Sequence, residues 1–183
     1  AWAFSLLGIH DYLLRFSGDR LIGQVRDALT ALLVGLYERT ATPDWPWFEE
    51  ILSYDNARLP HALIAGGRDG GDARALEIGL RALGWLVEGQ RAPQGHFRAI
   101  GCHGFYRKGH VPARFDQQPI EACATVAACL EAYRATQDLR WMNEARSSFE
   151  WFLGRSDLGQ ELNDPGTGGC SDGLQEGRIN RNQ

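Results

Sequence analysis

Apolar side chains recur every three or four residues along most of the chain, which is the period of an amphipathic α-helix. In residues 20–39 the leucines and valines fall at this spacing and would build one continuous apolar stripe. Similar patterns predict six helices, over residues 4–16, 20–39, 56–65, 73–89, 119–135 and 139–153. We therefore expect an all-α fold.

Short polar breaks divide these helices into three pairs. An aspartate stands between the two helices of each pair: Asp19, Asp72 and Asp138. Its carboxylate can accept a hydrogen bond from the first turn of the second helix. The repetition predicts three copies of a helical hairpin, forming a single domain over residues 1–183.

A different signal marks the start of the third helix. Asp55 can cap a helix over residues 56–65, in which Pro60 is tolerated only near the first turn. The glycine-rich residues 66–72 that follow are expected to form the break before the next helix.

Two long connections, residues 41–54 and 91–118, are rich in aromatic, glycine and charged residues. Such long loops in a compact domain usually serve function. They favour hairpins closed into a toroid, with the loops gathered over one mouth, over an open solenoid with short links. Because such a ring commonly holds six hairpins, we expect an incomplete toroid in which residues 156–183 begin the next turn.

The charge and hydropathy of the chain narrow its partners. A formal charge of -4 argues against nucleic acid, because binding through phosphate contacts needs a basic excess. No apolar run reaches the roughly 18 to 20 residues that span a bilayer, and the first residues lack a basic signal-peptide region. We expect no membrane span and a cytoplasmic location.

The cysteines do not form a recognisable metal-binding pattern. None of the four is part of a CxxC motif, and reduced thiols are expected. Zinc binding by residues of one loop is the alternative, with His96, Cys102, His103 and His110 as ligands, although their spacing fits no familiar tetrahedral site. We expect neither a metal nor another cofactor.

Residues 45–50, with three aromatic rings and two carboxylates, form the segment most typical of a ligand site. Sugars stack on exposed aromatic faces, so Trp45, Trp47 and Glu49 are candidate sugar-binding residues. The alternative is that Trp47 and Phe48 fill the base of the loop.

Two further segments, residues 54–58 and 114–121, share an aromatic residue, an aspartate and an amide before the first helix of a hairpin. Counting back from the aspartates between the helices aligns Asp55 with Glu121, with Asp116 one turn earlier. Hydrolysis of a glycosidic bond needs two carboxyl groups, one protonated and one ionised. Asp55, Asp116 and Glu121 are therefore the candidate catalytic residues, and helix capping is the alternative role for the two aspartates.

Other polar side chains in these segments suit sugar hydroxyl groups. Candidate sugar-binding residues are Tyr54, Asn56, Arg58, His61, Gln117 and Gln118. For His61 the alternative is a structural histidine in a helix. Residues 103–108 could form a lid, a subsite or a solvated loop.

Four segments together resemble a known family: residues 45–50 (Trp-Pro-Trp-Phe-Glu-Glu), 54–60 (Tyr-Asp-Asn-Ala-Arg-Leu-Pro), 115–121 (Phe-Asp-Gln-Gln-Pro-Ile-Glu) and 151–155 (Trp-Phe-Leu-Gly-Arg). From about residue 35 onward the chain is similar to a bacterial helical domain found C-terminal to some group 1 glycosyltransferases, or alone as a glycosidase-related protein. The resemblance implies an (α/α)6 toroid of the six-hairpin glycosidase kind, with a sugar-binding mouth. Residues 164–173 also resemble a loop of that family, and their composition fits a metal site, a sugar site or a plain turn.

These observations predict a carbohydrate-active domain, similar to a glycoside hydrolase, that acts on or binds an oligosaccharide. The alternative is a non-catalytic glycan-binding or scaffold domain that serves a glycosyltransferase. A pure interaction solenoid and an amino-sugar epimerase using His61 and His103 are further alternatives. Because an incomplete toroid would expose apolar hairpin faces, we also expect self-association.

Overall fold

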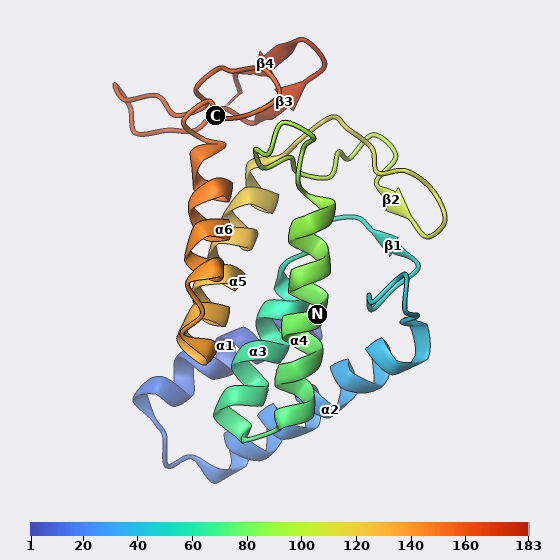
Figure 1. Ribbon diagram of the computed structural model, residues 1–183. Coiled ribbons are helices and arrows are strands. Elements are labelled where there is room, and N and C mark those ends of the chain that lie inside the picture. The colour runs from blue at the N-terminus through green and yellow to red at the C-terminus, as the bar shows by residue number, and fades with distance from the viewer. Residues whose placement is uncertain (183) are drawn as a thin grey trace.

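The computed structural model describes residues 1–182 and consists mainly of α-helices, which confirms the all-α class (Figure 1). The helices are α1 (Trp2–Arg15), α2 (Arg20–Thr40), α3 (Arg58–Gly70), α4 (Ala73–Gly89), α5 (Pro119–Thr136) and α6 (Leu139–Glu150). The strands are β1 (Ile51–Leu52), β2 (Tyr106–Arg107), β3 (Gly173–Gln175) and β4 (Arg178–Asn180). Residue 183 lies outside the described part of the chain.

Consecutive helices pack as three hairpins, α1 with α2, α3 with α4 and α5 with α6. The capping predicted between the helices is confirmed, because Asp19 accepts the backbone N–H of Ile22 at 3.1 Å and Asp72 accepts that of Ala75 at 3.0 Å. Asp138 caps α6 in the same way.

The first helices of the hairpins lie side by side, with α3 between α1 and α5. All three run in the same direction. Glu121 at the start of α5 contacts the residues just before α3, whereas Glu131 near the end of α5 pairs with Arg68 near the end of α3. The chain enters α3 from β1 and α5 from the long loop that carries β2, so both helices begin on the side where these loops lie (Figure 1).

The third helix differs from its prediction at both ends. It begins at Arg58, and the residue at its N-cap position is Ala57, whose side chain cannot cap the helix. The predicted capping by Asp55 was therefore wrong. It continues through the glycine-rich stretch to Gly70, and Gly67 in this stretch packs closely against the start of α4. A Cβ atom on Gly67 would lie 2.6 Å from the backbone nitrogen of Leu76.

Two small antiparallel pairings complete the fold. Strand β1 pairs with β2 and joins the two long loops, while β3 pairs with β4 near the C-terminus. Residues 156–183 were predicted to begin the next helical hairpin of the ring, which is wrong for the described residues 156–182, because these form turns and the β3–β4 hairpin. Glycine is frequent in this segment, and both the glycines and Pro165 disfavour a helix.

The protein has two apolar clusters. The larger one joins the three hairpins and includes the aromatic residues of the loop 45–48, such as Trp47 and Phe48. The smaller one lies under the C-terminal segment and centres on Trp151 and Leu174. The C-terminal segment is therefore packed on the long loop 91–118 as a cover, and β3 contacts it through a bridge from Leu174 to Gln117.

Candidate functional site

A surface hollow of about 400 Å³ lies where α1 and α3 begin. It is lined by Ala1, Trp2, Ala3, Phe4, Leu33, Leu36, Glu49, Ser53, Tyr54, Asp55, Arg58 and Leu59. Four of these residues were predicted from the sequence to bind sugar or act in catalysis: Glu49, Tyr54, Asp55 and Arg58. The structure therefore brings together part of the predicted site.

Asp55 occupies an unusual position in this hollow. Its backbone is left-handed, with φ of 51°, in the turn that leads into α3. The Nε of Arg58 donates to both of its carboxylate oxygens, at 3.2 and 3.1 Å. Burial raises the pKa of Asp55 above its ordinary value, although the charge of Arg58 opposes this shift. A carboxyl group that retains its proton more readily is suited to donate one.

Glu121 supports this turn from the neighbouring helix α5. Its carboxylate accepts the backbone N–H groups of Asp55 and Asn56 and, at 2.9 Å, the side-chain amide of Asn56. The Glu121 side chain is buried, and this burial raises the pKa of its carboxyl group. Glu121 and Asn56 do not line the hollow. We conclude that both residues shape the turn around Asp55, and that their predicted contact with substrate has no support in this geometry.

Exposed aromatic rings border the hollow. Tyr54 is 60% exposed, Trp2 is 40% exposed and Phe4 is 56% exposed. Stacking on a sugar ring requires such an accessible face. The N-terminal aromatic residues were not predicted, because an apolar residue in an amphipathic helix is expected to face the core.

The predicted sugar contacts of Trp45 and Trp47 were wrong. Both indoles are buried in the larger apolar cluster, at 3% and 0% exposure, so neither offers a face to a ligand. Trp45 packs edge-on against Trp85 and Tyr106, and its indole N–H donates to the backbone oxygen of Glu49 at 2.7 Å. The alternative role, filling the base of the loop, is the one that the structure shows for Trp47 and Phe48.

Gln117 is also a structural residue. Its side chain is fully buried, and its amide oxygen accepts the indole N–H of Trp151 at 3.0 Å. Its amide nitrogen donates to Asp157 at 2.9 Å. Gln118 is the residue before α5 and makes no side-chain cap. Neither glutamine lines the hollow, so sugar binding by them is not supported there.

Asp116 lies outside the hollow and does not cap α5. Its carboxylate accepts a long hydrogen bond from Gln175 at 3.4 Å and lies 3.9 Å from the Nδ1 of His103. Asp55 and Asp116 therefore do not line one hollow, and the predicted pairing of these aspartates has no support in this geometry.

His61 lies one turn beyond Arg58 on α3 and does not line the hollow. Burial, together with the nearby positive groups of Arg58, His10 and Arg134, lowers its pKa to about 4. Its Nδ1 has no hydrogen-bond partner among the described residues. A neutral, mostly enclosed imidazole fits the structural alternative better than sugar binding or an epimerase base.

A polar cluster around Asp157 was not predicted from the sequence. This carboxylate, 1% exposed, pairs with Arg98 at 2.7 Å, with His96 at 3.0 Å and with Arg114 at 3.1 Å. Hydrogen bonds from Arg98 and His96 hold the pKa of Asp157 far below its ordinary value, although burial opposes them. The cluster fastens the long loop 91–118 to the C-terminal segment.

The part of the chain that the structure describes contains no group of three or more His, Cys, Asp or Glu residues that could hold a metal ion. The zinc alternative is therefore not supported, since His96 is engaged with Asp157. The loop 164–173 forms a turn in which Asp164 accepts the backbone N–H of Gly166 at 2.8 Å. Among residues 1–182, no helix has the length and apolar character needed to cross a bilayer.

Comparison with models of known protein families finds no match, and comparison with curated protein sequences finds none either. The fold and the hollow define an all-α, helical-hairpin protein with a small polar and aromatic surface site. The resemblance to six-hairpin glycosidases stays a prediction.

Proposed function

We propose that the hollow at the start of α1 and α3 is the glycan-binding site of a carbohydrate-active domain. The observation that carries this proposal is the convergence of exposed aromatic rings with Glu49, Asp55 and Arg58 in one hollow. Aromatic faces suit the apolar side of a sugar ring, while carboxylate and guanidinium groups suit its hydroxyl groups. The volume lies within the range of small-molecule sites, which is roughly 300 to 1,000 Å³.

In the proposed reaction, hydrolysis of a glycosidic bond, Asp55 is the proton donor. Burial favours its protonated form, as a general acid requires. Glu49 is the other carboxylate of the hollow and is exposed to solvent, where it can activate a water molecule. This assignment replaces the partnership of Asp55 with Asp116 or Glu121 that the sequence predicted.

One observation favours a second candidate, a non-catalytic glycan-binding or scaffold domain that serves a glycosyltransferase. Glu121, the carboxylate aligned with Asp55, is occupied by the backbone of the neighbouring turn, and Asp55 itself is paired with Arg58. In this candidate the same hollow holds a glycan, and neither carboxylate transfers a proton.

Binding and turnover of manno-, gluco- and galacto-oligosaccharides by the purified protein distinguish these candidates. We expect Asp55→Asn to abolish turnover and retain binding, whereas Asp116→Asn, outside the hollow, retains both. Binding without turnover by the unmodified protein would favour the scaffold candidate. Absence of both would overturn the proposal and leave an interaction solenoid.

We also propose self-association and a cytoplasmic location. Large apolar residues remain exposed on the first hairpin, including Leu14, Phe16 and Leu21 at 68%, 56% and 68% exposure. Contact between such surfaces would remove them from water. Light scattering over a concentration series tests self-association: we expect a rising mean mass that Leu14→Glu reduces, and a monomer at high concentration would refute it.

A further inference from the structure

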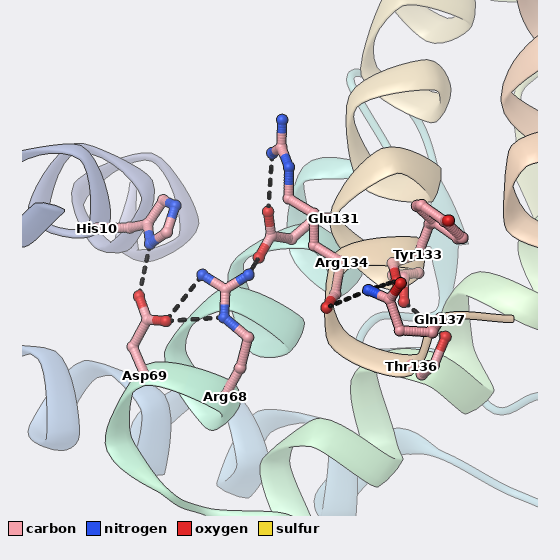
Figure 2. Close-up of polar contacts among 9 residues, drawn as sticks. His10, Arg68, Asp69, Glu131, Tyr133, Arg134, Thr136 and Gln137 are labelled. Atoms are coloured by element: carbon pink, nitrogen blue, oxygen red, sulfur yellow. Dashed lines mark hydrogen bonds and ion pairs between the residues drawn. The ribbon is translucent and has the colours of Figure 1, made fainter.

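A chain of ion pairs crosses α1, α3 and α5 outside the lining of the hollow, toward the ends of α3 and α5. The Nδ1 of His10 lies 2.6 Å from the carboxylate of Asp69, and Arg68 pairs with Asp69 at 2.8 Å (Figure 2). Arg68 also pairs with Glu131 at 2.5 Å, and Arg134 pairs with Glu131 at 3.1 Å (Figure 2). The chain therefore joins the first helices of all three hairpins.

His10 connects α1 to this chain from a buried position. It is 8% exposed and is the member of the chain whose ordinary pKa lies nearest neutral pH. Its hydrogen bond to Asp69 raises its pKa, and the charge of Glu131 adds to this effect, while burial and Arg68 oppose it.

The other elements around His10 also carry charged groups. On α2, Arg26 donates to the backbone oxygen of Asp69 at 2.9 Å and pairs with Asp27. On α3, His61 is close enough for the charge of His10 to lower its pKa. The ion pair of His10 with Asp69 thus joins α1 directly to α3, among groups of both charges. Glu131 and Arg134 on α5 continue the chain from Arg68.

The opposite end of the same hairpin forms a wall of the hollow. Trp2 and Phe4 at the start of α1, and Leu33 and Leu36 on α2, line the hollow. Asp55, in the turn before α3, and Arg58, the first residue of α3, line it too. The packing of the first hairpin on α3 therefore determines whether these two groups of residues lie together.

We propose that His10 and Asp69 form a pH-sensitive latch that holds the α1–α2 hairpin, and one wall of the hollow, against α3. Because the pKa of His10 is raised in the folded protein, its stabilisation is complete below the ordinary value of 6.5 and is lost as the pH rises through the folded value. Because the pKa of Asp69 is lowered, its stabilisation is lost only as the pH falls below its ordinary value of 3.8. The latch is closed in mildly acidic solution and weakens in alkaline solution.

The proposal of the latch depends only on the contacts of His10 and Asp69. The proposal that the latch controls ligand binding rests on the function proposed for the hollow. Hydrogen exchange tests the latch without a glycan. Protection factors, which divide out the pH dependence of intrinsic exchange, should fall about tenfold in α1 and α2 between pH 6 and pH 8.5, the loss expected for one charge-assisted hydrogen bond. Protection in α5 and α6 should change much less.

Two variants and one control make the test specific. His10→Gln, which does not titrate, should show low protection in α1 and α2 at both pH values, and His110→Gln in an exposed loop should behave as the unmodified protein. If His10→Gln does not fold, the NMR titration of His10 replaces it, with a pKa above 6.5 that returns toward 6.5 in Asp69→Asn. Equal pH dependence in all helices, or a His10 pKa unaffected by Asp69→Asn, would overturn the latch.

Glycan binding measured at the same pH values separates the two proposals. Loss of binding at pH 8.5 together with lost protection supports control of the hollow by the latch. If the protection of α1 and α2 depends on pH but no glycan binds at either pH, the latch is retained and the function proposed for the hollow is overturned. Binding that persists while α1 and α2 lose protection overturns the control by the latch.

Discussion

The carboxylate of Glu121 accepts hydrogen bonds from both the backbone N–H and the side-chain amide of Asn56, 65 residues earlier in the chain. This contact joins the first turn of α5 to the turn that leads into α3. Two neighbouring hairpins are therefore held in register at the end where the hollow lies.

Replacement of Glu121 should destabilise the protein. In Glu121→Ala the buried N–H groups of Asp55 and Asn56 lose their acceptor, and each unsatisfied group costs about 1 to 3 kcal/mol. We expect the free energy of unfolding to fall by about 3 kcal/mol, measured by urea denaturation. Glu77→Gln, at an exposed position of α4, is the matched control and should change the free energy of unfolding by less than about 0.5 kcal/mol. Equal stability of the two variants would contradict the role assigned to Glu121.

The ion-pair cluster around Asp157 gives a second prediction. Asp157→Asn should cost about 3 kcal/mol, because it leaves Arg98 with no carboxylate partner in a partly buried site. Since the pKa of Asp157 is lowered in the folded protein, its contribution is complete above its ordinary value of 3.8 and is lost as the pH falls further.

Denaturation at pH 7 and at pH 3 measures this effect. The difference in unfolding free energy between the unmodified protein and Asp157→Asn should shrink at pH 3. Asp44→Asn, at an exposed position in a turn, serves as the control. A difference that grows at low pH would show that the ion pairs do not stabilise the loop.

The helices could be predicted from the sequence because local periodicity and the capping aspartates determine them. The stretch around Gly67 was assigned as a break, since the sequence does not reveal that Gly67 packs against the start of α4. The site was predicted only in part. Tyr54, Asp55 and Arg58 lie in one short segment, whereas the burial of Trp47 depends on rings far away in the chain. Asp157 is bound by residues 40 and more positions away, which leaves no local pattern.

Close packing of α3 against α4 gives a third prediction. A Cβ atom on Gly79 would lie 2.8 Å from the Ile64 side chain and 3.0 Å from its backbone nitrogen, so Gly79→Ala should destabilise by about 1 to 3 kcal/mol. Gly23 in α2 has no such neighbour, and Gly23→Ala should stabilise by about 0.5 to 1 kcal/mol through helix propensity alone. Thermal unfolding shows whether each variant is more or less stable than the unmodified protein. A stabilising Gly79→Ala would show that the two helices can separate without cost.

The contrast between exposed and buried aromatic rings gives the last prediction. Tyr54 lines the hollow and is 60% exposed, so Tyr54→Ala should weaken oligosaccharide binding about tenfold and leave stability within about 0.5 kcal/mol. Trp47 is fully buried, so Trp47→Ala should cost about 3 to 5 kcal/mol of unfolding free energy. Val111→Ala, at an exposed position remote from the lining of the hollow, should change neither quantity. Titration calorimetry and urea denaturation on the same preparations separate the two effects. If Tyr54→Ala binds as tightly as the unmodified protein, the glycan does not stack on this ring, and the hollow loses its principal support as a sugar site.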